Sequence, residues 1–181
     1  MLFRSKPVNI LFTSVGRRVE LMRAFKRAYD ALGVVGHVIG TDINPLAPAL
    51  QIVDRPHIVP RNTHADYIPV LKHLLSQYQV DLVFPLIDPD IPILAKHRVE
   101  LEATGAQVAV VGHEAATTTR DKWLTYQFFR DNGIPTPQSW LPEQLSAAEL
   151  TYPLFIKPRS GSAAKDAFRV EDAAQLAFFL G

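Results

Sequence analysis

Short apolar runs rich in Val, Ile and Phe alternate along this chain with longer stretches whose apolar residues recur at helical spacing. The apolar runs predict strands buried on both faces of a sheet, and the longer stretches predict the helices that cover those faces. This alternation is typical of βαβ units around a parallel sheet. The predicted strands are Val8–Thr13, His37–Asp42, His57–Pro60, Asp81–Ile87 and Gln107–Val111.

Three helices are predicted between these strands, over Arg17–Leu32, about Ala65–Tyr78, and Pro89–Ala103. Gly33 follows the first of them as a left-handed cap. We therefore expect residues 1–112 to form a Rossmann-like α/β domain with a doubly wound parallel sheet.

The pattern changes in residues 113–181, where an α+β arrangement is predicted. Its expected elements are a Thr-rich turn at 117–119, a helix at about 121–132, a short strand near Ser139, a helix at 142–149, a hairpin-like pair at 153–158 and 167–171, and a last helix at 172–180.

Charge and composition narrow the classes of partner and compartment. The chain has 19 Lys and Arg against 18 Asp and Glu, so it has no basic excess that would indicate nucleic acid or an anionic membrane as a partner. The absence of cysteine excludes disulfides and thiolate metal sites. The lack of cysteine also fits a reducing compartment, so we expect a cytoplasmic protein. No uncharged apolar stretch is long enough to span a bilayer.

Polar side chains follow the first, second and fourth predicted strands, at the ligand-binding edge of an open α/β sheet. Arg17 and Arg18 begin a helix, where they could clamp a carboxylate or phosphate. Asp42 ends the second strand, where it would either contact a ribose or open a turn. Asp88 precedes Pro89 and Asp90, and it would either bind a substrate amine or metal or cap a helix.

Several well-known motifs are absent. The first loop has one glycine, so the G-x-G-x-x-G dinucleotide fingerprint is missing. The six histidines show no zinc-binding spacing, and Ser160-Gly161-Ser162 lacks the pattern of a nucleophile elbow.

Two lysines stand out by their context. Lys122 lies in the first turn of a helix, where the helix dipole opposes a cation unless an anion binds nearby. Lys157 ends an apolar strand, just before the polar loop 159–165. Loop amides and cations in this arrangement could share the charge of a phosphate chain. Each lysine alone could simply face water, and only the pair in this order indicates a site.

This order of segments resembles the ATP-grasp superfamily. The resemblance lies in Thr-Arg-Asp-Lys opening a helix, Asn-Gly-Ile-Pro-Thr-Pro closing it, and Tyr-Pro-Leu-Phe-Ile-Lys-Pro before a small-residue loop. Residues 9–18 and 42–49 are most similar to carbamoyl-phosphate synthase large-subunit-like proteins. The resemblance implies a pre-ATP-grasp domain followed by the start of an ATP-grasp small lobe.

The same resemblance implies a ligase that uses ATP and Mg²⁺ to convert a carboxylate into an acyl phosphate, which an amine or similar nucleophile then attacks. The residues that would contact ATP are Lys122, Lys157, Arg159, Ser160, Gly161, Ser162 and Lys165. On the substrate side it points to Arg17, Arg18, Asp42 and Asp88.

The family's later Glu-x-Asn magnesium motif has no counterpart here, because no Asn follows Asn132. We therefore expect the chain to be the N-terminal portion of a ligase, either artificially shortened, from a broken gene, or one product of a split gene. By itself it is not expected to catalyse, and a second copy or a complementary chain would complete the ATP-grasp domain. The alternative is a non-catalytic Rossmann-like binding module, or a regulatory or assembly module.

Overall fold

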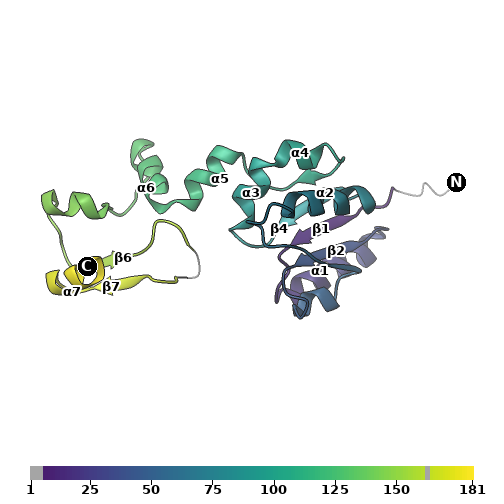
Figure 1. Cartoon of the computed structure of the whole chain (residues 1–181), viewed down its shortest axis with the longest axis horizontal. Coiled ribbons are helices and arrows are strands. Elements are labelled where there is room, and N and C mark those ends of the chain that lie inside the picture. The colour runs from purple at the N-terminus through teal and green to yellow at the C-terminus, as the bar shows by residue number, and fades with distance from the viewer. Residues whose placement is uncertain (1–5, 162–163) are drawn as a thin grey trace. The chain divides into compact units, whose positions relative to one another are not determined.

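The computed structural model of the 181-residue chain describes residues 6–161 and 164–181. The chain divides into two compact units, Met1–His113 and Glu114–Gly181, called unit 1 and unit 2 below. Figure 1 colours unit 1 from purple to teal and unit 2 from green to yellow.

A five-stranded parallel sheet forms the centre of unit 1, with the order β3-β2-β1-β4-β5. β1 lies in the middle and pairs with β2 on one side and β4 on the other, with Ile10 opposite both Val38 and Leu82. The predicted parallel α/β sheet is therefore confirmed. The strands are β1 (Ile10–Thr13), β2 (Val38–Asp42), β3 (Arg55–Ile58), β4 (Leu82–Pro85) and β5 (Gln107–Val108).

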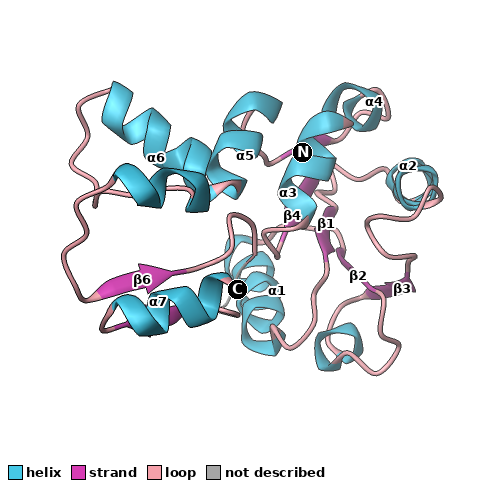
Figure 2. Ribbon diagram, turned by 60° about the vertical axis from the view of Figure 1, so that its left-hand side comes forward, coloured by secondary structure: helices cyan, strands magenta, loops and turns pink. Residues whose placement is uncertain are grey.

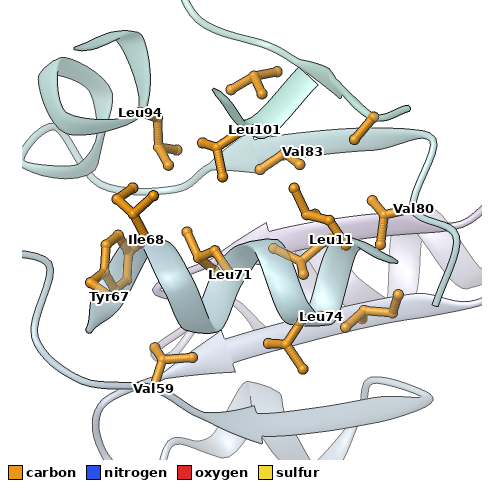
Figure 3. Packing of buried hydrophobic residues seen from close by; sticks show 14 residues of the cluster. Leu11, Val59, Tyr67, Ile68, Leu71, Leu74, Val80, Val83, Leu94 and Leu101 are labelled. Carbon is orange, nitrogen blue, oxygen red and sulfur yellow. The ribbon is translucent and has the colours of Figure 1, made fainter. Parts of the chain in front are cut away.

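Side chains of the central strand point alternately to two separate hydrophobic clusters, as the period of two in a strand requires. Ile10 and Phe12 pack with the fully buried Met22 of the first helix, while Leu11 packs with the second helix on the opposite face. Figure 3 shows this second cluster, in which Leu71 and Leu74 lie against the sheet. The helical elements of unit 1 are α1 (Val19–Leu32), η1 (Pro48–Gln51), α2 (Tyr67–Gln77), α3 (Asp90–Lys96) and α4 (Arg98–Glu102).

Helix boundaries in unit 1 differ in detail from the predictions. α1 begins two residues later than predicted, and it ends as expected at Gly33 with a left-handed φ of 63°. The single helix predicted over Pro89–Ala103 is two helices, because the backbone of His97 leaves helical angles between α3 and α4. Leu94 and Leu101 both remain fully buried on either side of this break.

Unit 2 contains helices and one antiparallel hairpin. Strands β6 and β7 pair with Leu154 opposite Val170, which confirms the predicted hairpin-like pair, and α7 lies beside them (Figure 2). The elements are α5 (His113–Arg120), α6 (Lys122–Asp131), η2 (Pro142–Ala147), β6 (Leu154–Ile156), β7 (Phe168–Val170) and α7 (Ala173–Leu180).

Three predictions for unit 2 were wrong. The Thr-rich segment is helical in α5, where the Thr119 hydroxyl donates to the Ala115 carbonyl one turn earlier at 2.8 Å. No strand forms near Ser139, because Pro135 and Pro137 remove two backbone donors from that segment. The helix predicted at 142–149 is the six-residue 3₁₀ helix η2.

Candidate functional site

The loop between β1 and α1 is held from one side by Asp42. Its carboxyl accepts from the Gly16 amide at 2.8 Å and from the Asn44 amide at 2.9 Å. Asp42 is only 8% exposed. Both carboxyl oxygens are thus used inside the fold, at the carboxyl end of β2, and they fix the backbone of two neighbouring loops.

The same loop is held from the other side by Asp90, the first residue of α3. Its carboxyl is fully buried and accepts from three neutral donors, namely the hydroxyls of Thr13 at 2.6 Å and Ser14 at 2.8 Å and the side-chain amide of Asn62 at 2.8 Å. Ser14 itself has a left-handed φ of 53°. The two carboxyls of Asp42 and Asp90 therefore brace one loop between them.

Tyr67 brings a further polar group to this region. The residue is 2% exposed, and its hydroxyl makes no hydrogen bond within residues 6–161 and 164–181. Burial and the neighbouring charge of Asp90 raise the pKa of the Tyr67 hydroxyl above its ordinary value. The hydroxyl consequently stays protonated near Asp90.

These residues lie at the topological switch point of the sheet. The chain proceeds from β1 to β2 on one side and pairs β1 with β4 on the other, so the carboxyl ends of β1 and β4 are neighbours, with Thr13 opposite Pro85. Open α/β sheets bind ligands at this crevice. The site is therefore in the place where a substrate of unit 1 is expected.

Arg17, Arg18 and Asp88 are exposed at the same edge. Arg17 and Arg18, the cap residue, directly precede α1. They form no ion pair within the part of the chain that the structure describes, so their guanidinium groups are free for an anion. Asp88 does not cap α3, because Pro89 is the cap residue and no side chain makes the capping hydrogen bond. The capping role considered for Asp88 is therefore wrong.

In unit 2, the start of α6 is joined to the segment that follows β6. Asp121 caps the helix by accepting from the amides of Trp123 at 2.8 Å and Leu124 at 3.2 Å. The Lys122 amide donates to the Arg159 carbonyl at 2.9 Å, and its ammonium donates to the Gly161 carbonyl at 3.2 Å. Segments nearly forty positions apart in the sequence thus meet around Lys122.

The other predicted phosphate contacts are arranged around this junction. Lys157 and Lys165 are exposed and form no ion pair among the described residues, whereas Arg159 pairs with Asp121. Ser160 and Gly161 are exposed, and Gly161 has a φ of 128° that favours glycine. Ser162 lies outside the described residues. The structure therefore brings Lys122 to the 159–161 segment and leaves two further lysines nearby in sequence unpaired.

Neither a metal cluster nor a membrane span occurs in the parts of the chain that the structure covers. No group of three or more His, Cys, Asp or Glu side chains is placed to hold a metal ion in residues 6–161 and 164–181. Within the same residues, every helix is too short or too polar to cross a bilayer.

Comparison with known proteins identifies both units. Residues 10–109 match the family model described as PylC-like, N-terminal domain, and residues 119–181 match the model of an ATP-grasp domain. This chain belongs to the PylC-like, N-terminal domain family. The ATP-grasp resemblance stated from the sequence is thereby confirmed.

Relatives of this PylC-like chain include a carbamoyl-phosphate synthase of Methanobrevibacter smithii, 33% identical over 132 residues. That match covers 70% of this chain and 35% of the synthase, so the chain spans about a third of its curated relative. The L-amino acid ligase of Bacillus licheniformis has the same fold, with a TM-score of 0.69 at 20% identity over 95% of this chain and 41% of that one.

A second solved structure, N5-carboxyaminoimidazole synthetase from Staphylococcus aureus complexed with ADP, has a TM-score of 0.66 at 17% identity. The likeness covers 98% of this PylC-like chain and 45% of the synthetase. At these identities the solved structures establish the fold that the two units share with ATP-grasp proteins.

Sequence reasoning singled out Asp88 as the site residue after β4, but the buried carboxyl there is Asp90. The Asp-Pro-Asp spacing contained a signal, since Asp90 is the first residue of α3 and Asp88 lies two residues before it, in the exposed turn. Asn62 lies in the loop before α2 and Tyr67 is the first residue of α2. Both were missed entirely, because they approach Asp90 only through the tertiary fold.

Proposed function

We propose that this chain supplies the substrate-facing domain and the first part of the nucleotide lobe of an ATP-dependent ligase. In the proposed reaction a carboxylate oxygen attacks the γ-phosphorus of ATP, ADP leaves, and an acyl phosphate forms. An amine or similar nucleophile then attacks the acyl carbon, and phosphate leaves. The observation that supports the ATP site is the junction of Lys122 with residues 159–161, close in sequence to the unpaired Lys157 and Lys165.

Cations suit this role for an electrostatic reason. A triphosphate carries several negative charges, and ammonium groups that are not neutralised by carboxylates can share that charge with loop amides. Mg²⁺ would supply further charge neutralisation when bound. The described residues contain no cluster that fits Mg²⁺, so we assign no ligand for it here.

On the substrate side, we propose that Arg17 and Arg18 bind a carboxylate at the start of α1. A planar guanidinium matches a carboxylate with two parallel hydrogen bonds, and the free amides at the start of a helix add to the attraction. Asp88 is exposed at the same sheet edge and is proposed to face a cationic group of the nucleophile. Asp42 contributes by holding the Gly16 amide in place.

Isothermal titration calorimetry with ATP tests the nucleotide site. Replacing Lys157 with alanine is expected to weaken ATP binding about tenfold, because one charge-assisted phosphate contact is lost. Lys122→Ala is expected to have a similar effect.

Lys96 provides the matched control, since it is an exposed lysine of unit 1 with no ion pair in the described part of the chain. Lys96→Ala should leave ATP affinity unchanged. A wild-type chain that binds ATP with the same affinity as Lys157→Ala would refute the assignment of Lys157 and favour the alternative of a non-catalytic binding module.

Exposed aromatic residues on unit 2 support a proposal about partners. Phe155 of β6 is 71% exposed and Phe178 of α7 is 80% exposed, while Phe168 and Phe179 stack with ring centroids 4.6 Å apart. Apolar surface of this kind usually marks contact with another protein. We propose that a second copy of the chain covers these side chains, with Phe155 on one face of the hairpin and Phe178 beside the Phe168–Phe179 pair.

Sedimentation velocity checks this proposal. The 181-residue chain is expected to associate as its concentration rises, and the double substitution Phe155→Ser/Phe178→Ser is expected to shift the chain toward monomer, because two large exposed apolar side chains are removed. Val99→Ser is the control, since Val99 is 85% exposed but lies in unit 1. If the double variant and the wild type sediment identically at all concentrations, the aromatic surface is not the contact.

A further inference from the structure

Arg159 forms an ion pair with the carboxylate of Asp121. Its Nε lies 3.2 Å and 3.0 Å from the two carboxyl oxygens of Asp121, and its Nη2 lies 2.5 Å from Oδ2. A hydrogen bond from Arg159 holds the pKa of the Asp121 carboxyl below its ordinary value. The Nε and Nη2 groups of Arg159 thus donate to the Asp121 carboxylate and are not free to bind a phosphate.

The same two segments are joined a second time by the backbone. The Lys122 amide donates to the carbonyl of Arg159 itself, and the Lys122 ammonium donates to Gly161 two residues later. Lys122 is the first residue of α6, so its amide has no acceptor inside the helix. Its position relative to residues 159–161 therefore depends on what holds that segment in place.

Charge gives the ion pair a second consequence. Asp121 is the sequence neighbour of Lys122, and without Arg159 its carboxylate would stand unneutralised beside a cation proposed to bind phosphate. Like charges repel, so an unpaired Asp121 would oppose a triphosphate. The ion pair with Arg159 neutralises the Asp121 carboxylate and so removes that repulsion.

We infer that Arg159 is a positioning residue rather than a phosphate ligand: through Asp121 it fixes residues 159–161 against the start of α6 and so places Lys122. This inference rests on the proposed ATP site and revises one of its residues. The direct contact that the family resemblance implies for Arg159 makes a different prediction, because a direct contact does not depend on Asp121.

A double-mutant cycle separates the two roles. Asp121→Asn breaks the ion pair and retains the helix cap, since Asn and Asp are equally good capping residues. Arg159→Met keeps the length of the side chain and removes its charge. ATP affinity is measured by calorimetry for the wild type, both single variants and the double variant.

In the wild-type background, Arg159→Met is expected to weaken ATP binding about tenfold. In the Asp121→Asn background, the same substitution should change the affinity by less than about twofold, because the partner through which it acts is gone. An equal loss in both backgrounds would establish a direct phosphate contact and overturn the inference.

Amide exchange measured by NMR without nucleotide distinguishes this inference from the proposed function. Arg159→Met should make the Lys122 amide exchange about fivefold faster, while the Trp123 amide, bonded to Asp121, serves as the internal reference. Unchanged protection of Lys122 refutes positioning by Arg159 whether or not ATP binds. Failure of the wild-type chain to bind ATP, with Lys122 protection lost in Arg159→Met, would count against the ATP site alone.

Discussion

Gly36→Ala is expected to destabilise unit 1 by about 3 kcal/mol, because both the conformation and the surroundings of Gly36 exclude a side chain. Its φ is 151°, which side chains rarely adopt, and a Cβ built there would lie 1.8 Å from the Val8 carbonyl oxygen. The Val8 amide also donates to Val35 at 2.8 Å. The backbone could accommodate alanine only by moving the entry to β1 away from the turn before β2.

Gly33→Ala is the matched control, three residues earlier. Gly33 also has a positive φ, of 63°, but no atom lies within 4 Å of the added Cβ. Gly33→Ala should therefore lower the free energy of unfolding by only about 1 kcal/mol, the usual penalty for a left-handed residue that is not glycine. Urea unfolding followed by far-UV circular dichroism, with hydrogen exchange of β1, measures both. Equal losses for the two variants would show that close approach to Val8 has no energetic role.

Asp90→Ala is expected to destabilise unit 1 by about 3 kcal/mol, because three donors lose a buried acceptor at once. The Thr13 hydroxyl is fully buried and would have no replacement partner from water. Ser14 and Asn62 would also lose their contacts, which would loosen the loop that leads to Arg17 and Arg18. Hydrogen exchange should therefore increase in residues 13–18 before the rest of the sheet.

Asp90→Asn provides the comparison. Its remaining oxygen can still accept from Thr13 and Ser14, and Asn62 can turn its amide to offer an oxygen to the new NH₂ group. A loss of about 1 kcal/mol is expected, measured by the same urea titrations. If Asp90→Ala lowered the free energy of unfolding less than Asp90→Asn, the hydrogen bonds of the buried carboxyl would not stabilise unit 1.

Local patterns in the sequence predicted the elements of unit 1 well. The apolar runs located every strand of the parallel sheet, and Gly33 marked the end of α1. Apolar patterning succeeds best for β1 and β2, because they are buried on both faces and burial leaves an apolar run wherever the strand pairs. The edge strand β3 is mostly exposed, and the predicted segment overlaps it only in part. Unit 2 was predicted less well because its segments are short and proline-rich, so their conformation depends on local turns.

For the candidate sites too, local sequence patterns predicted some features and not others. Arg17, Arg18, Lys122 and Lys157 could be selected from the sequence, because an exposed cation at the end of a strand or the start of a helix is visible in local order. The residues that these segments contact in the folded chain could not be predicted from the sequence. Asn62 reaches Asp90 across 28 positions and Arg159 reaches Asp121 across 38.

The sequence alone therefore determined most of the strands and helices of unit 1 and the charged residues at their ends, since both follow from spacing within a few residues. Only the tertiary structure decided that Asp90 is the buried carboxyl at the sheet edge and that Arg159 pairs with Asp121. A hydrogen bond or ion pair requires two groups within about 3 Å. Packing of distant segments sets that distance, and no local pattern encodes it.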